Sequence, residues 1–267
     1  MAVSLEKGQK ISLDKTAGSS LTQIKMGLGW DVAKSKGFFG FGGSSETIDL
    51  DASCLMFDEQ KQAVDAIWFA QLTSKDGSIP GRFWINLRTT DLHRKYDLAD
   101  LTFHESIPGH VWEGEFSNRL PLIRSILAFN AFSEGWALYA EQLADELGAY
   151  KGFEVGRLGF LQSLAFRACR LVVDTGLHSK QWTREQGRAF FVERNGSKVE
   201  EVASEVDRYC SWPGQACGYK IGHSQILRQR ERAKAELGGK YDMREFNTAL
   251  VLGGNAPLSV MATTVSR

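Results

Sequence analysis

The segment at positions 104–110, His-Glu-Ser-Ile-Pro-Gly-His, contains side chains that could bind zinc and activate water. In a simple metalloprotease helix the two histidines stand four residues apart and flank a glutamate base. Here they stand six apart, which is about 600° on an unbroken helix, so the two rings would point apart. Pro108 breaks a helix and Gly109 permits a bend, which can bring His110 back beside His104. The alternative is two ordinary histidines near a helix end.

A candidate third ligand follows in an apolar stretch. Glu134 and Glu141 are seven residues apart, which places them two turns along one face of a predicted helix. A glutamate among aromatic and aliphatic neighbours is costly to bury unless it is paired or bound to a metal. His104, His110 and Glu134 would give zinc three protein ligands and leave one position for water. For Glu141 we expect solvent exposure or a hydrogen bond that supports a ligand.

Other polar residues are candidates for roles around such a centre. Tyr219 could donate a hydrogen bond to a developing oxyanion, or it could be a core tyrosine. A substrate carboxylate could be held by Arg208, Tyr209 and Lys220, although exposed basic residues are usually only solvated.

Asp174 and His178 are four residues apart on one face of a predicted helix. They could form a second metal pair, but we favour hydrogen bonds that support the structure or the centre.

Helices must position these residues. Apolar side chains at spacings of three and four predict a helix with one buried face, at Val199, Val202, Val206 and Tyr209. Capping boxes are expected at Thr183 with Gln186 and at Asp242 with Glu245. A long periodic run begins near Phe153, and Gly176 is expected to end that helix.

The beginning of the chain differs from the rest. Residues 1–79 contain eight lysines but no arginine, proline or histidine, whereas residues 80–267 contain seventeen arginines and all five histidines. Apolar residues alternate with other residues around positions 24–28 and 48–51, which predicts half-buried strands. We therefore expect two parts, 1–79 and 80–267, unless this distribution is chance clustering.

Four short motifs occur in residues 1–79 in a fixed order. They are Val-Ser-Leu-x-Lys-Gly at 3–8, Leu-Gly-Trp-Asp at 28–31, Asp-Leu-Asp-Ala-Ser at 49–53 and Ser-Lys-Asp-Gly-Ser at 74–78. This part resembles the first half of a TerD-type tellurium-resistance domain, a calcium-binding β-sandwich. The resemblance implies calcium ligands at Asp31, Asp49 and Asp51, whose carboxylate oxygens suit calcium. The alternative is that these aspartates cap turns in solvent.

Four further motifs span residues 80–267. They are His-Glu-x-x-Pro-Gly-His at 104–110, Glu-Gly-Trp-Ala-Leu-Tyr-x-Glu at 134–141, Val-Asp-Thr-Gly-x-His at 173–178 and Tyr-x-x-x-Pro-Gly-Gln-x-x-x-Tyr-Lys-Ile-Gly at 209–222. This part resembles the bacterial family known as domain of unknown function 885, which is similar to helical zinc carboxypeptidases (gluzincins) of the Taq type. The resemblance implies His104, His110 and Glu134 as zinc ligands and Glu105 as the base.

Composition limits the partners. The formal net charge is zero and the pI is about 7.0, so neither a nucleic-acid nor a membrane partner is expected. The chain start lacks the apolar core of a signal peptide, which predicts a cytoplasmic protein. Oligomeric state is left open.

Together these observations predict an α+β protein, with a partial β-sandwich segment followed by a mainly helical gluzincin-like part. The expected function is zinc-dependent hydrolysis of a peptide or small amide substrate. Zinc would lower the pKa of its bound water, and Glu105 would accept the proton. The alternative is a calcium-binding TerD-type stress-response module without catalysis.

Overall fold

The computed structural model describes residues 53–57, 63–68, 95–121, 124, 127 and 129–265. The chain divides into two compact units, Met1–Ala52 and Ser53–Arg267, and all of the described residues belong to the second. This division falls before residue 80, near which the sequence predicts a join between two parts. That join stays a prediction. The expected strands around positions 24–28 and 48–51 lie outside the described residues, as do Asp31, Asp49 and Asp51.

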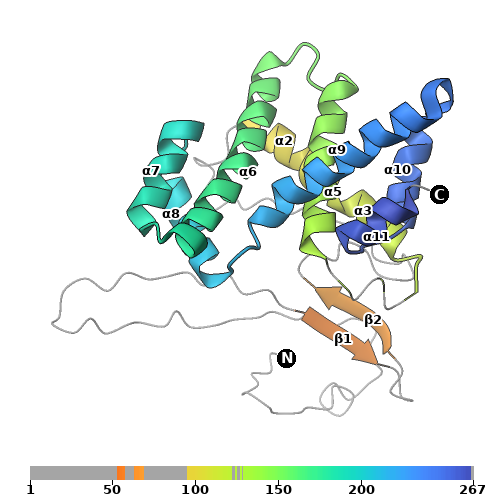
Figure 1. Ribbon diagram of the computed structural model, residues 1–267, viewed down its shortest axis with the longest axis horizontal. Coiled ribbons are helices and arrows are strands. Elements are labelled where there is room, and N and C mark those ends of the chain that lie inside the picture. Colours follow the sequence, from red (N-terminus) through yellow and green to blue (C-terminus); the bar gives the residue numbers. More distant parts are fainter. Residues whose placement is uncertain are drawn as a thin grey trace, which may run out of the picture. The chain divides into compact units, whose positions relative to one another are not determined.

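The expected α+β class with a partial β-sandwich is wrong for the described part of the chain, which is mainly helical (Figure 1). Its strands are β1 (Ser53–Phe57) and β2 (Ala63–Trp68), which pair antiparallel with an irregularity in register after Met56. A sandwich requires two sheets packed face to face. Within the described residues these two strands form a single two-stranded sheet.

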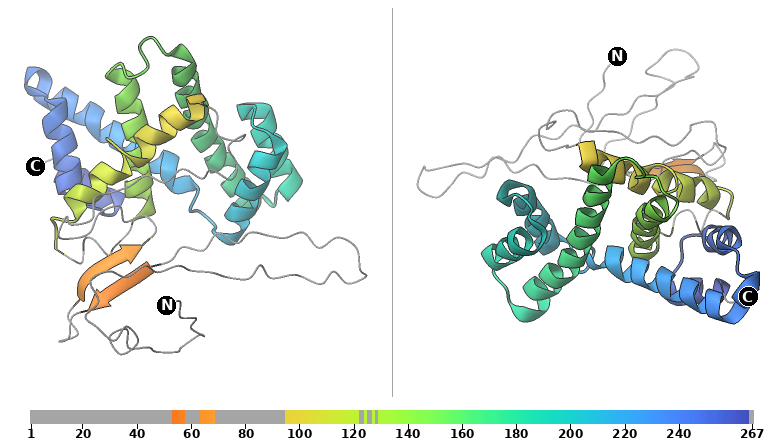
Figure 2. Two further views of the ribbon diagram at one scale, coloured as in Figure 1. Left: turned by 180° about the vertical axis from the view of Figure 1, so that it is seen from behind. Right: turned by 90° about the horizontal axis from the view of Figure 1, so that it is seen from above.

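Helices make up the rest. In chain order they are α2 (Lys95–Glu105), α3 (His110–Ser117), α5 (Asn130–Glu146), α6 (Glu154–Lys180), α7 (Arg184–Asn195), α8 (Val199–Ser211), α9 (Cys217–Leu237), the short 3-10 helix η2 (Gly238–Lys240), α10 (Met243–Leu252) and α11 (Leu258–Thr264). The long helices α5, α6 and α9 run through the middle, with α7 and α8 at one end and α10 and α11 at the other (Figure 2). None of the described helices is long and apolar enough to cross a membrane.

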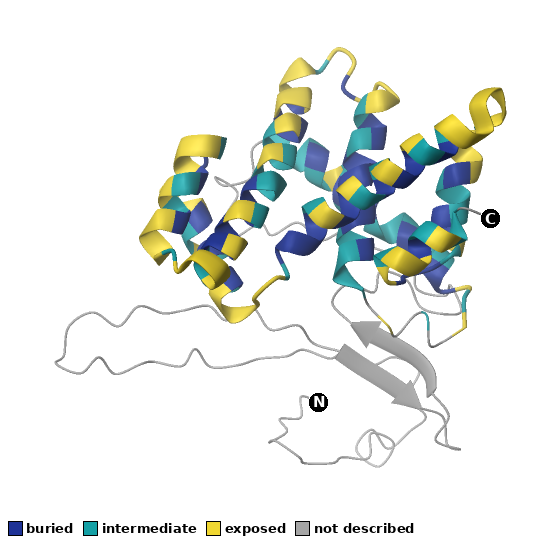
Figure 3. Ribbon diagram, viewed as in Figure 1, coloured by how far each residue is buried: buried dark blue, intermediate teal, exposed yellow. Residues whose placement is uncertain are grey.

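Two apolar clusters hold these helices together. In the first, aromatic residues of α5, including Phe132 and Trp136, pack against α9, α10 and α11. In the second, Val173 of α6 meets Phe191 of α7 and the apolar face of α8. Figure 3 shows the buried residues of α5 and α9 where the two helices cross.

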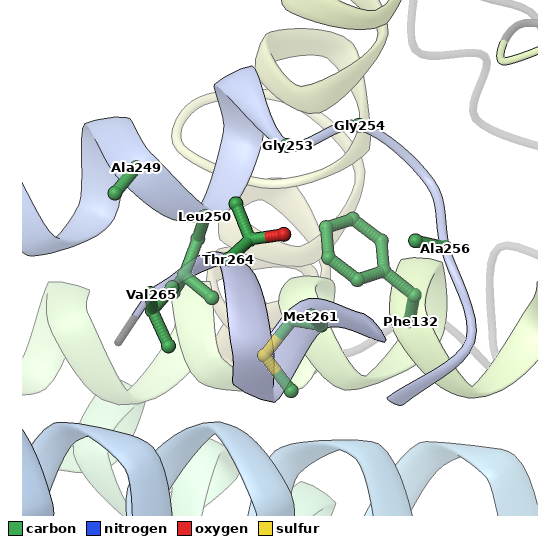
Figure 4. A pocket seen from close by; sticks show the side chains of 9 residues that line it. All are labelled: Phe132, Ala249, Leu250, Gly253, Gly254, Ala256, Met261, Thr264 and Val265. Atoms are coloured by element: carbon green, nitrogen blue, oxygen red, sulfur yellow. The ribbon is translucent and has the colours of Figure 1, made fainter. Parts of the chain in front are cut away.

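The C-terminal helices close over one end of α5. Side chains of α10, α11 and the segment between them surround Phe132, as Figure 4 shows for Leu250, Ala256 and Met261. The gap that these groups enclose leaves no room for water, so this end of α5 is sealed by apolar contacts.

Most of the local helix signals are confirmed. α8 buries Val202, Val206 and Tyr209, although Val199 at its start is exposed. Thr183 forms the expected capping box with Gln186. At the start of α10, Asp242 accepts a hydrogen bond from the backbone N–H of Glu245.

The expected end of a helix at Gly176 is wrong. α6 starts after Phe153, as expected, but it continues through Gly176 to Lys180, and the next residue, Gln181, adopts a left-handed conformation with φ of 57°. A Cβ at Gly176 would lie 2.5 Å from the ring of Trp182. Glycine therefore serves close packing of the indole at this position.

Candidate metal centre

The structure brings together three side chains that the sequence singled out. His104 lies at the end of α2, His110 opens α3, and Glu134 lies in the first turns of α5. Glu134 Oε2 is 3.4 Å from His104 Nε2 and 3.3 Å from His110 Nε2. One ligand atom from each of the three residues lies within 4.8 Å of the other two, so the group could hold a metal ion.

A break between α2 and α3 makes this arrangement possible. α2 ends at Glu105 and α3 begins at His110, and the two imidazole rings meet edge to face with centroids 4.9 Å apart. A Cβ at Gly109 would lie 1.7 Å from the carbonyl oxygen of His104, so only glycine fits there. The turn is tied to α5 because Trp136 Nε1 donates a hydrogen bond to the carbonyl oxygen of Pro108, at 3.0 Å.

The other ring nitrogen of His104 is held by a carboxylate. His104 Nδ1 lies 2.6 Å from Glu141 Oε1, and Glu141 Oε2 accepts a hydrogen bond from Ser163 Oγ at 3.0 Å. Burial raises the pKa of Glu141, but Arg167 and His104 outweigh it and keep this pKa below its usual range. Because the carboxylate is an acceptor, Nδ1–H of His104 donates to Glu141, and the Nε2 side of the ring faces Glu134.

His110 is oriented through a serine. Its Nδ1 lies 3.3 Å from Ser133 Oγ, which donates a hydrogen bond to Glu113 Oε2 at 2.8 Å. Because the hydroxyl proton of Ser133 points to Glu113, the hydroxyl oxygen of Ser133 accepts a hydrogen bond from Nδ1–H of His110. Nε2 of His110 also faces Glu134.

The Nε2 atoms of two imidazoles and a carboxylate oxygen thus converge in a largely buried space. When no metal is bound, Nε2 of His104 carries a proton toward Glu134, and a metal ion would take the place of that proton. Burial lowers the pKa of His104, but its hydrogen bonds to Glu134 and Glu141 outweigh burial and raise this pKa to about 10. Burial raises the pKa of Glu134, but the nearby His110 and His104 hold it well below its usual range. The cluster therefore attracts positive charge. Two imidazoles and one carboxylate fit a divalent metal ion such as zinc.

Glu105 lies beside this cluster. It is half-buried, and its side chain makes no hydrogen bond or ion pair with other residues of the described part of the chain. Its negative charge contributes to raising the pKa of His110. A carboxylate near the ligands but outside the cluster can accept a proton from water.

Tyr219 of α9 also lies at the centre. Its ring stacks on that of His104 with centroids 6.2 Å apart and an angle of 15° between the planes. Its hydroxyl oxygen accepts a hydrogen bond from Arg208 Nη2 at 3.2 Å, which leaves the phenol proton free to be donated. The Arg170 guanidinium lies 4.4 Å from the centroid of the Tyr219 ring and fixes the ring from α6.

The three residues proposed to hold a substrate carboxylate lie in different surroundings. Arg208 is partly exposed and also donates to Gln215 Oε1 at 2.9 Å. Tyr209 is buried in the second apolar cluster, with its hydroxyl donating to Glu205. Lys220 Nζ lies 3.1 Å from Nδ1 of His223.

Asp174 and His178 lie outside the cluster. The carboxylate of Asp174 accepts hydrogen bonds from the backbone N–H of Gly214, and His178 Nε2 bonds the carbonyl oxygen of Tyr209 at 2.8 Å. Both residues connect α6 to α8 and the turn that follows it.

Sequence reasoning missed the residues that hold the ligands in place. Glu113, Ser133, Ser163 and Arg167 each contact a ligand or its immediate partner. Glu113 could have been found, because it stands three residues after His110 on one helix face. Ser163 and Arg167 come from α6, and no sequence spacing links that helix to His104.

The fold and the cluster together define a mainly helical protein with a candidate metal site of two histidines and one glutamate. Residues 56–265 match the model of the family described as bacterial protein of unknown function (DUF885), and the chain belongs to this family. Residues 1–88 match the model of the TerD domain, so the two matches overlap at 56–88. Both families named from the sequence are therefore confirmed.

Two solved structures resemble the helical part. One, from Colwellia psychrerythraea, is described as a candidate lipoprotein and is 48% identical, with a TM-score of 0.71 over 73% of this chain and 34% of that chain. The other, from Shewanella oneidensis, is described as a candidate lipoprotein of unknown function and is 26% identical, with a TM-score of 0.62 over 65% of this chain and 32% of that one. The chain thus spans about a third of the length of each of these two proteins.

Curated relatives match the first part of the chain. Tellurium resistance protein TerZ of Serratia marcescens is 47% identical over 79 residues, which are 29% of this chain and 40% of that protein. Stress response protein SCP2 of Bacillus subtilis (strain 168) is 43% identical over 84 residues, 30% of this chain and 42% of that protein. These relatives support a module of the tellurium-resistance and stress-response type at the beginning of the chain.

Proposed function

We propose that the helical part binds one zinc ion through His104, His110 and Glu134 and hydrolyses a peptide or small amide. The observation that supports this proposal is the convergence of two Nε2 atoms on one Glu134 oxygen, at 3.3–3.4 Å. Each Nδ1 atom is engaged elsewhere, by Glu141 and by Ser133. Such partners are typical of metal-binding histidines.

The chain's own residues would divide the chemistry between them. A bound zinc ion would supply Lewis-acid activation of water and of a carbonyl group. Glu105 would accept the proton of the attacking water and pass it to the leaving amine. Tyr219 would donate its phenol proton as a hydrogen bond to the carbonyl oxygen as negative charge develops there.

Substitution of Glu105 by glutamine tests the hydrolytic part of the proposal. Glu105→Gln keeps the shape of the side chain but removes the base, so zinc content should stay the same while peptide hydrolysis falls by about 10²–10⁴-fold. Hydrolysis of a mixed peptide library, followed by mass spectrometry, measures the loss. Glu193→Gln, an exposed change on α7, is the matched control. Full activity in the Glu105→Gln protein would rule out Glu105 as the base.

A second candidate function belongs to the TerD segment, as a calcium-binding stress-response module without catalysis. The comparisons favour it over hydrolysis, because the curated relatives named above are described as tellurium-resistance or stress-response proteins. The two solved structures are not described as hydrolases. Calcium would be bound by Asp31, Asp49 and Asp51. The cytoplasmic location and the absence of nucleic-acid and membrane partners stay predictions from the sequence.

Metal identity separates the two candidates. We would equilibrate the purified chain with equal concentrations of zinc and calcium, remove free ions and measure the bound metals by elemental analysis. About one zinc per chain that is lost in His104→Ala supports the first function. Calcium bound to the wild type and lost in Asp49→Asn, together with no bound zinc, supports the second function.

A further inference from the structure

Behind the metal centre, two carboxyl groups are hydrogen-bonded to each other in the interior. Glu141 of α5 is 0% exposed and Asp100 of α2 is 2% exposed. A hydrogen bond joins their side chains. Two carboxyl groups can form such a bond only if one of them carries a proton.

The surroundings place this proton on Asp100. The oxygens of Glu141 already accept from His104 Nδ1 at 2.6 Å and Ser163 Oγ at 3.0 Å, and Arg167 Nη2 lies 3.5 Å from Oε1, so Glu141 acts as an acceptor. Burial and the negative charge of Glu141 raise the pKa of Asp100 to about 7. Tyr150 donates a weak hydrogen bond to Asp100 Oδ1 at 3.4 Å. Asp100 is therefore the donor and Glu141 the acceptor.

Asp100 also borders a cavity of about 160 Å³ between α2, α6 and the start of α8. Polar side chains line most of it, including Asp97, Gln162, Ser163, Arg167 and Glu201. A water molecule takes about 30 Å³ in the liquid, so a polar space of this size has room for several waters. Glu141 is not among the lining residues, whereas Asp100 is.

We infer that Asp100 is a positioning residue of the metal centre, whose carboxyl group holds Glu141 against His104 Nδ1 and separates this contact from the polar cavity. The inference rests on the proposed metal site. Asp100 lies two hydrogen bonds away from the metal-facing nitrogen of His104, so it acts only through Glu141. Because Ser163 and Arg167 also hold Glu141, loss of Asp100 should weaken metal binding without abolishing it.

Three substitutions test this role in the full chain. Asp100→Asn retains a donor for Glu141 and an acceptor for Tyr150. Asp100→Leu keeps the branched arrangement of side-chain heavy atoms and removes both. Glu201→Gln changes a residue that lines the same cavity from α8, and it is the matched control. Metal affinity would be measured by titration with Co²⁺ at about pH 6, where Asp100 is mostly protonated, and the visible absorption of bound Co²⁺ reports the geometry of its ligands.

Asp100→Leu should weaken Co²⁺ binding roughly tenfold, the lower end of the range for residues that orient metal ligands, and should change the absorption spectrum. Asp100→Asn and Glu201→Gln should match the wild type in both measurements. If Asp100→Leu does not fold, as judged by circular dichroism, Asp100→Ala replaces it. The void left by alanine opens into the existing cavity, so this variant should fold and still bind more weakly than Asp100→Asn.

The outcomes distinguish this inference from the proposed function. Equal affinities and spectra in all variants, with Co²⁺ bound to the wild type, overturn only the role of Asp100. Equal weakening in Asp100→Asn and Asp100→Leu also overturns it, because the retained donor would then make no difference. A wild-type chain that binds no Co²⁺ overturns the proposed metal site and this inference with it.

Discussion

Gly135 of α5 lies against Gly222 of α9 with no space for a side chain on either helix. A Cβ at Gly135 would lie 2.5 Å from Cα of Gly222, and a Cβ at Gly222 would lie 1.7 Å from the carbonyl oxygen of Ala131. This close approach sets the distance between the helix that carries Glu134 and the helix that carries Tyr219. Both helices reach the metal centre because their backbones touch at this point.

Gly222→Ala should therefore destabilise the protein by about 3 kcal/mol, because the added methyl group must push two backbones apart. Urea unfolding followed by circular dichroism measures the change. The control is Gly114→Ala in α3, where a Cβ would meet nothing within 4 Å. Alanine should be neutral or stabilising there, since it favours helix over glycine. Equal stability of the wild type and Gly222→Ala would contradict the packing described.

Ser133→Ala should weaken zinc binding by about 10–100-fold, because it leaves His110 Nδ1 and Glu113 without the hydroxyl group that joins them. Competition with a coloured chelator measures the affinity. Ser204→Ala removes an exposed hydroxyl on α8 and should have no effect. Unchanged affinity in Ser133→Ala would mean that His110 is oriented without this serine.

His223 should make stability depend on pH. Nδ1 of His223 accepts a hydrogen bond from Lys220 at 3.1 Å, and Nε2–H donates to Gln142 Oε1 at 2.8 Å, so the ring is neutral. Burial and then the charge of Lys220 lower the pKa of His223 from 6.5 to about 4. Between these values the unfolded chain binds a proton and the folded chain does not. The free energy of unfolding therefore falls as pH drops through this window, by up to about 3 kcal/mol.

His223→Gln should remove this part of the pH dependence. Urea unfolding of metal-free protein at several pH values from 4 to 8 measures it, with His178→Gln as the control. If the free energy of unfolding changes with pH equally in the wild type and in His223→Gln, His223 does not contribute to the pH dependence.

The sequence was sufficient for features that depend on nearby residues. The spacing of Val202, Val206 and Tyr209 predicted the buried face of α8, and Thr183 with Gln186 predicted the start of α7. The six-residue interval between His104 and His110 led to a proposed break at Pro108 and Gly109, and α2 and α3 are separated there. Each of these features follows from steric or hydrogen-bonding rules within a few residues.

Features that depend on distant contacts were missed. From the sequence Gly176 predicts a helix end, but its small size accommodates Trp182, and that contact depends on how the chain turns after α6. Asp100 and Ser163 reach Glu141 from two other helices, so no local spacing links them. The β-sandwich was inferred from family resemblance, and the described strands form only one antiparallel pair.

The zinc content of the full chain tests the central claim most directly. We would load the wild type and His104→Ala, His110→Ala and Glu134→Ala with zinc, remove free metal and measure zinc per chain by elemental analysis. His178→Ala removes a histidine that lies outside the cluster and serves as the control. We expect about one zinc per chain in the wild type and the control, and loss of most of it in each of the other three. Zinc content that is the same in all five proteins, or no zinc in the wild type, would contradict a metal centre at His104, His110 and Glu134.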